Sequence, residues 1–234
     1  MSAVARKEIA GYFKSPIAYV LIGVYILIIS IFFHPALNAG YGDFVEVLDD
    51  VGVFLIFIIP ILTMRILAED KKNGTEVLLL TSPTSLPKIV IGKFLATFTV
   101  FLVIVGISFI YPIVVVLFEG AITTQLVGAY IGFILLGAAF CSIGVFCSSL
   151  TENQIIAAII SLVILFGMWI ADQFAATVGG LAGAIMEWIS VLTRYGVFTK
   201  GLLTMENIIF FVSFTAMMLY MTVRVIERRR WVQG

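Results

Sequence analysis

The sequence has little charge for its length. Only 12% of its 234 residues are charged, about half of the roughly 25% that is usual in soluble domains. Hydrophobic residues make up 62% of the chain, and the mean hydropathy is +1.16. A soluble protein of this size has no interior large enough for so much apolar surface, and a disordered chain would need many more polar residues. The composition therefore predicts an integral membrane protein with the lipid bilayer as its solvent.

The sequence also lacks the groups that most binding and catalytic sites need. Basic and acidic residues number 14 each, so no basic excess exists to neutralise phosphates and no nucleic-acid partner is expected. The single histidine, His34, has no partner for a metal site. Cys141 and Cys147 lie about 9 Å apart along a helix, which is too far for a disulfide. The sequence therefore predicts no catalytic, cofactor-binding or metal-binding residue.

Long apolar stretches are what the sequence has instead. A spanning helix needs about 20 largely apolar residues, and six stretches approach that length, at 17–33, 51–66, 94–118, 126–148, 155–171 and 207–225. A seventh stretch, at 173–186, is too short to span and predicts a re-entrant or interfacial element, with an ordinary loop helix as the alternative. The predicted fold class is an all-α integral membrane protein, a single transmembrane domain over residues 1–234. It has six transmembrane helices and a short re-entrant element before the last one, within an extracytoplasmic segment at 172–206.

Basic residues are distributed unevenly among the predicted loops. Three lie in the N-terminal segment, five between the second and third spans, and four in the C-terminal tail. Only Arg194 and Lys200 fall on the other side of the membrane. Because loops rich in lysine and arginine stay in the cytoplasm, we expect both termini to be cytoplasmic. The predicted location is a bacterial-type inner (cytoplasmic) membrane, crossed several times.

The N-terminal segment, residues 1–15, has the pattern of an amphipathic helix. Ile9, Tyr12 and Phe13 fall on one helical face, and the charged residues off that face are Arg6, Lys7 and Lys14. Such a helix is suited to lying on the inner leaflet. A frayed cytosolic tail is the alternative.

The cytoplasmic loop at 68–92 is the most distinctive segment. Asn73-Gly74 is a turn signal, and Thr75 is expected to start a short helix that ends before Ser82-Pro83. A short helix held outside the membrane is suited to docking on a soluble partner, whereas a solvated loop that only reverses the chain is the alternative. The candidate docking residues are Glu69, Asp70, Lys71, Lys72, Gly74, Thr75, Glu76, Leu78, Leu79, Ser82 and Pro83.

The order of these residues resembles a known family. Arg65, the charged cluster at 69–75, the Leu-rich turn at 78–83 and Gly92-Lys93 resemble, in order and spacing, the membrane subunits of type-2 ABC transporters. The opening residues 7–19 and the ending 228–231 are similar to the gliding-motility branch of that family. The likeness covers essentially the whole chain.

The resemblance implies a function that composition does not show. Two permease subunits, identical or related, would pair in the membrane and export a substrate such as a lipid, polysaccharide, drug or peptide. Each would dock a coupling helix, within about residues 69–84, on a separate ABC ATPase subunit that binds ATP and Mg. The motif G-x-x-x-x-G-K-[ST] is absent from this chain, so this chain would not hydrolyse ATP by that route. The N-terminal helix would match the family's connecting helix, and residues 173–186 its extracellular re-entrant element.

Three other classes remain open. An ion-coupled secondary transporter would keep ionisable residues inside the membrane, whereas the acidic residues here fall in predicted loops. A non-transporting membrane scaffold is a further alternative. An intramembrane enzyme would need a nucleophile with a base at membrane depth, and the one histidine lies near the end of the first span.

Glycines in the fourth span allow close approach of another helix. Gly128 and Gly132 form a small-xxx-small pair of the kind found where membrane helices touch. Packing within the chain is the favoured interpretation, and packing between two subunits is the alternative.

Overall fold

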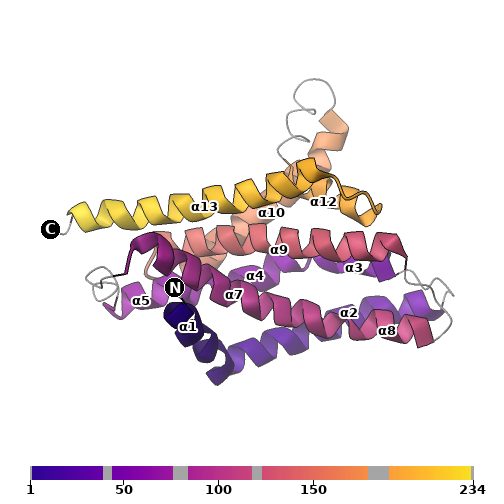
Figure 1. The fold of residues 1–234 in the computed structure, drawn as a ribbon, viewed down its shortest axis with the longest axis horizontal. Helices are drawn as coiled ribbons and strands as arrows, with labels where there is room; N and C mark the ends of the chain where they lie inside the picture. Colours follow the sequence, from indigo (N-terminus) through magenta and orange to yellow (C-terminus); the bar gives the residue numbers. More distant parts are fainter. Residues whose placement is uncertain (1, 39–43, 76–83, 118–122, 179–189, 233–234) are drawn as a thin grey trace.

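The computed structural model describes residues 2–38, 44–75, 84–117, 123–178 and 190–232, and within these ranges the regular structure is entirely helical. The N-terminal half contains α1 (Ser2–Lys14), α2 (Pro16–Asn38), α3 (Phe44–Gly52), α4 (Leu55–Thr63), α5 (Arg65–Lys72), α7 (Leu86–Ser108) and α8 (Ile110–Leu117). The C-terminal half contains α9 (Thr124–Leu150), α10 (Gln154–Val178), α12 (Val191–Thr199) and α13 (Met205–Val232). The helices form one elongated bundle (Figure 1). The prediction of an all-helical protein is confirmed.

Five helical stretches in the described part of the chain are long and apolar enough to cross a membrane. They are Pro16–Pro35, Leu86–Leu117, Thr124–Leu150, Gln154–Phe174 and Met205–Arg229. A sixth crossing is possible if Phe44–Gly52 and Leu55–Lys72, which meet at a bend of 54°, count as one broken span. The described part of the chain thus has five to six candidate spans, where the sequence predicted six.

The second span differs most from its expected bounds. We expected one apolar helix at 51–66 after an outer loop, but α3 begins at Phe44 and three short helices, α3, α4 and α5, follow one another. In α3, Phe44, Val47, Leu48 and Val51 are buried on one face, because their spacing is helical. The acidic residues of the same segment lower its hydropathy, and this is why an apolar-run criterion missed it.

The third and fifth spans also differ from expectation. The third span begins at Leu86 instead of 94 and is interrupted between α7 and α8. Its first two turns were not predicted because Lys88 and Lys93 lower their hydropathy. α10 continues to Val178, so residues 173–178 extend the fifth span and do not start a separate re-entrant element. The rest of that expected element, 179–186, lies outside the described residues.

α9 is the central helix of the bundle. Its most apolar 18-residue stretch is 72% buried, against 17% for those of α10 and α13. Glycines make this burial possible: a Cβ on Gly137 would lie 2.1 Å from the Phe101 ring of α7, and one on Gly144 would lie 2.0 Å from Oγ1 of Thr63. Gly128 and Gly132 lie against Phe198 of α12, where a Cβ on either glycine would come within 3 Å of that residue. The small-residue pair therefore packs within the chain, as the favoured interpretation expected.

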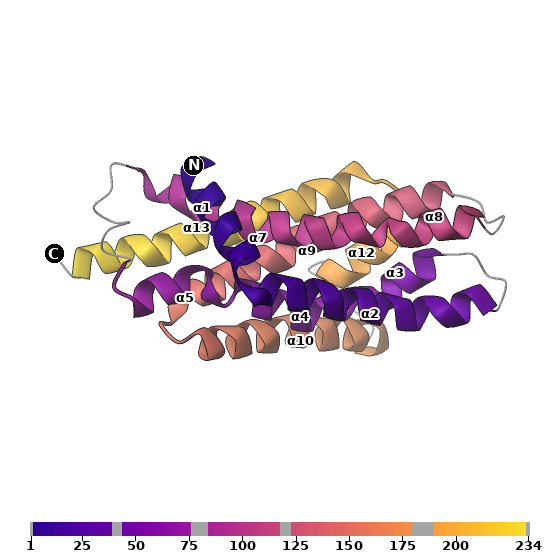
Figure 2. The ribbon, with the colours of Figure 1, turned by 90° about the horizontal axis from the view of Figure 1, so that it is seen from below.

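The bundle has two distinct ends. α1, α5 and the C-terminal turns of α13 lie toward one end, here called the terminal end (Figures 1 and 2). α3, α8 and α12 lie toward the other, here called the distal end. The expected amphipathic helix (α1) and the start of the expected docking loop (α5) are thereby placed together.

Candidate functional site

A buried lysine links three helices at the terminal end. Lys93 of α7 has a side chain only 1% exposed, and its Nζ lies 2.9 Å from Oε1 of Glu8 on α1. The same Nζ is 2.5 Å from Oδ2 of Asp70 on α5 and donates to the backbone oxygen of Ile66, at 2.6 Å. A charge that is removed from water must be paired and hydrogen-bonded to be tolerated. The two carboxylates therefore hold α1 and α5 against the start of α7.

The carboxylate of Asp70 also fixes the beginning of the following loop. The Thr75 hydroxyl lies 2.9 Å from Oδ1 of Asp70 and 3.2 Å from the Asp70 backbone oxygen. Gly74 has φ of 69°, a left-handed conformation that suits glycine at a helix C-terminus. The predicted Asn73-Gly74 turn is thus confirmed, and the chain that leaves α5 starts from a position set by the Lys93 ion pairs.

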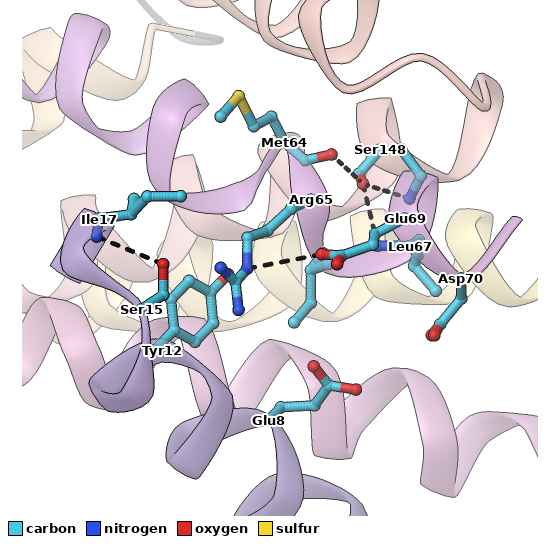
Figure 3. A network of polar contacts seen from close by, with 12 residues as sticks. Glu8, Tyr12, Ser15, Ile17, Met64, Arg65, Leu67, Glu69, Asp70 and Ser148 are labelled. Atoms are coloured by element: carbon cyan, nitrogen blue, oxygen red, sulfur yellow. Dashed lines mark hydrogen bonds and ion pairs between the residues drawn. The ribbon is translucent and has the colours of Figure 1, made fainter. Parts of the chain in front are cut away.

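A second contact joins α1 to the junction of α4 and α5 (Figure 3). The hydroxyl of Tyr12, fully buried, donates to the Leu62 backbone oxygen at 2.6 Å. The Arg65 guanidinium lies 4.7 Å from the centre of the Tyr12 ring and forms an ion pair with Glu69 at 3.8 Å. Burial raises the pKa of Tyr12 above its usual value, so the hydroxyl remains protonated and continues to donate.

The start of α5 is held by a serine from the central helix. Ser148 of α9 accepts hydrogen bonds from the backbone N–H groups of Leu67 and Ala68, at 3.1 and 3.0 Å, and donates to the Met64 oxygen at 2.9 Å (Figure 3). The first N–H groups of a helix have no partner within the helix. A side chain about 80 positions away in sequence supplies it here, and this couples α5 directly to the core.

One ion pair and one hydrogen bond at the rim complete the terminal end. Lys71 Nζ lies 2.9 Å from Oε1 of Glu152, just beyond α9. Arg229 of α13 donates to the backbone oxygen of Leu150 at 3.1 Å. These contacts are more exposed than Lys93 and contribute correspondingly less to stability.

The structure brings together part of each expected site. Of the docking residues, Glu69, Asp70, Lys71 and Thr75 take part in the contacts above, and Lys72 and Gly74 are exposed. Glu76, Leu78, Leu79, Ser82 and Pro83 lie outside the described residues. In α1, Tyr12 is buried and Ile9 and Phe13 are partly buried, while the exposed residues are Arg6, Lys7 and Lys14. One face of α1 therefore packs against the bundle, and the three basic residues lie off that face.

Sequence reasoning missed three members of the network. Lys93 was counted among the five basic residues between the second and third spans, Ser148 was placed at the end of the fourth span, and Glu8 was given no role. The available signal was a single lysine between the apolar residues Val90 and Val100, because a lysine inside an apolar helix requires a partner. Nothing in the sequence indicated which acids would supply it.

The polar contacts at the terminal end join helices to one another. Within the described ranges no three histidine, cysteine or acidic residues are grouped to hold a metal ion. The polar contacts instead join the helix before the loop to α1, α7 and α9. A movement imposed on the loop would therefore reach several membrane helices together.

The model of a family described as ABC-2 family transporter protein matches residues 1–231, almost the entire chain. No curated protein matches the chain.

Proposed function

The chain belongs to the ABC-2 family of transporter proteins, and from this premise we propose that it is an export permease driven through the loop that follows α5. Membership makes it a multi-pass membrane subunit that works with ATPase subunits. The further proposal is that the partner ATPase binds ATP and Mg and docks on residues 69–84. The observation that carries it is the Lys93 ion-pair group, which ties the start of that loop to α1, α7 and, through α5, to α9.

The proposed orientation places the terminal end in the cytoplasm. Twelve of the 14 basic residues then lie on the inner side, in accord with the positive-inside rule. In this orientation α1 lies at the inner face of the membrane with Arg6, Lys7 and Lys14 exposed, where cationic side chains meet anionic lipid head groups. The membrane is the inner membrane of a bacterial-type cell.

Two permease subunits, identical or related, form the proposed complex. Apolar side chains remain exposed along α2, α10 and α13, for example Leu27, Val163 and Val212, and they provide the surfaces for lipid and for the second subunit. A pathway lined by such residues does not stabilise a bare ion, so an amphiphilic substrate is proposed. The likeness of residues 7–19 and 228–231 to the gliding-motility branch favours that branch among the exporters.

Co-purification with the ATPase tests the docking proposal. The double variant Lys72→Glu with Glu76→Lys reverses two charges of the loop, and Lys72 is an exposed residue outside the Lys93 group. We expect the purified permease to lose its ATPase subunit while it keeps the same elution volume in size-exclusion chromatography. The matched control is Glu46→Lys with Lys200→Glu, which reverses one charge of each sign at the distal end and should retain the ATPase. Equal retention by both double variants would overturn docking on this loop.

Labelling of single cysteines tests the orientation. Cys141 and Cys147 are both fully buried, so the native chain gives a low background with a membrane-impermeant maleimide. In intact cells we expect Lys200→Cys to react and Lys72→Cys to react only after the membrane is permeabilised. The opposite pattern would reverse the topology and exclude docking of a cytoplasmic ATPase at this end.

A further inference from the structure

A cavity at the distal end has the size and lining of a small-molecule site. It lies among α2, α3, α9, α10 and α12 and has a volume of about 690 Å³, within the range of roughly 300–1,000 Å³ that is usual for such sites. Phe32, Phe54 and Trp169 contribute apolar surface to its wall. The contacts of the Lys93 group are all at the other end of the bundle, so the proposed docking function does not use this cavity.

The charges on the cavity wall are mainly negative. Asp49, Asp50 and Asp172 line the cavity with a single cation, Lys200. Gly52, the last residue of α3, also lines it, and the carboxyl end of a helix adds partial negative charge. A cationic group inside the cavity would therefore be stabilised.

The spacing of these carboxylates argues against a metal ion. Across the described residues no three histidine, cysteine or acidic side chains are close enough to hold one, although three aspartates share this wall. Asp172 is already engaged, because the hydroxyls of Ser190 and Thr193 donate to its Oδ1. Carboxylates spread around an apolar cavity fit an organic cation, which is larger than a metal ion. Its charged group would contact the carboxylates, and its apolar part would contact the apolar side chains.

A buried hydroxyl on the same wall supports an organic cation with N–H groups. Tyr195 of α12 lines the cavity and is 3% exposed, and its hydroxyl has no hydrogen-bond partner among the described residues. Buried polar groups in proteins are nearly always paired. Burial and the nearby Asp49 raise the pKa of Tyr195, so the hydroxyl stays neutral, and a small movement of the side chain toward the cavity would let it accept a hydrogen bond from an ammonium. The indole of Trp169 can add a cation–π contact.

We propose that the distal cavity binds an organic ammonium with an apolar body, held by Asp49, Asp50 and Tyr195. The cavity opens to the extracytoplasmic side in the proposed orientation, and that placement alone rests on the proposed function. The binding itself depends only on this chain and needs neither ATPase nor nucleotide. A failed docking experiment would therefore leave this proposal unaffected, and the reverse also holds.

Fluorescence anisotropy with a dansyl-alkylammonium probe tests the proposal on the full chain in neutral maltoside micelles. We expect saturable binding of the probe, and binding at least about tenfold weaker for the neutral dansylamide, because each lost charge-assisted hydrogen bond lowers affinity by about this factor. Equal binding of the two compounds, or no saturable binding, would overturn the proposal.

Variants of the cavity wall test the assigned residues. Asp49 and Asp50 are exposed, so Asp49→Asn and Asp50→Asn should fold normally, and each should weaken probe binding by about tenfold. Glu46→Gln is the matched control, because it removes the same charge from α3 at a residue that does not line the cavity. Tyr195→Phe should also weaken binding while it leaves the melting temperature unchanged. A loss as large in Glu46→Gln as in Asp50→Asn would assign the effect to general surface potential and overturn the site.

Competition identifies the source of the ammonium. Short-chain phosphatidylethanolamine carries the ammonium on a lipid, whereas short-chain phosphatidylglycerol carries none. Displacement of the probe by the first lipid alone would assign the site to a lipid head group, and retention of the probe with both would assign it to a soluble amine. Displacement by phosphatidylglycerol to the same extent would show that the acyl chains compete and would overturn recognition of the cation.

Discussion

The two ends of the bundle use charge in opposite ways. At the terminal end, Lys93 is almost fully buried and is paired with Glu8 and Asp70, whose side chains are 17% and 16% exposed. At the distal end, Arg194 is also largely buried, but its partner Glu206 is 77% exposed, and three aspartates line an open cavity. At the terminal end the charges are buried in ion pairs, whereas at the distal end several of them lie on the wall of a cavity.

This difference distinguishes an end whose helices are tied to one another from an end that has a cavity. Removal of one partner from a buried ion pair leaves an uncompensated charge, so α1, α5 and α7 are strongly held in one arrangement. An ion pair with a solvated partner imposes a much weaker constraint. The terminal end is therefore suited to transmit a movement of the loop, and the distal end is suited to adapt to what it binds.

The largest effect is expected when the buried lysine is removed. Lys93→Met leaves the carboxylates of Glu8 and Asp70 without their cation and should lower stability by about 3–5 kcal/mol. Arg194→Met, at the distal end, should cost much less, because Glu206 can be solvated. Melting temperatures in detergent, read by tryptophan fluorescence, give the comparison.

A triple variant separates the lost charge from the lost side chain. Lys93→Met combined with Glu8→Gln and Asp70→Asn leaves no unpaired carboxylate and should recover much of the loss. If the triple variant is as unstable as Lys93→Met alone, packing and not charge accounts for the effect, and the contrast between the ends disappears.

Substitution of two glycines in the central helix should also lower stability by different amounts, with smaller losses than removal of Lys93. Gly144→Ala places a Cβ 2.0 Å from Oγ1 of Thr63, and Gly128→Ala places one 2.9 Å from the Phe198 backbone oxygen. The first requires Thr63 to give up its hydrogen bond to Ile59, so it should cost about 1–3 kcal/mol, as overpacking does. The second should cost less. Gly106→Ala is the control in α7, because a Cβ there meets nothing within 4 Å, and thermal unfolding of all three gives the order.

Two serines that bind helix N-termini offer a third comparison. Ser148→Ala removes the acceptor for two N–H groups of α5, and Ser190→Ala removes the cap of α12, which bonds Thr193 N at 3.1 Å. Each loss should cost about 0.5–2 kcal/mol. Of the two variants, only Ser148→Ala should also weaken ATPase co-purification, because Ser148 contacts α5, where the proposed docking loop begins. Weaker co-purification in Ser190→Ala would contradict a coupling role confined to the terminal end.

The sequence was most informative where one residue property determined the structure. Apolar length located the five single spans, and the spacing of Ile9, Tyr12 and Phe13 located the amphipathic N-terminal helix. Prediction from the sequence failed at α3, where three acidic residues within nine lower the hydropathy of a helix that has a buried face. It also failed at Lys93, whose partners Asp70 and Glu8 lie 23 and 85 positions earlier in the chain. A charge next to an apolar run shows that a partner must exist, but the identity of that partner depends on tertiary packing.

The smallest effect is expected at the exposed rims, where the ends should not differ. Glu152→Gln breaks the ion pair with Lys71 and Glu206→Gln breaks the one with Arg194; both acids are well exposed, at 63% and 77%. Each substitution should change stability by only about 0–1 kcal/mol, and added salt should reduce even that difference, because it screens exposed charges. Chemical denaturation at low and high ionic strength measures both. A loss in Glu152→Gln that approaches that of Lys93→Met would mean that the rim, and not the buried lysine, holds the terminal end together.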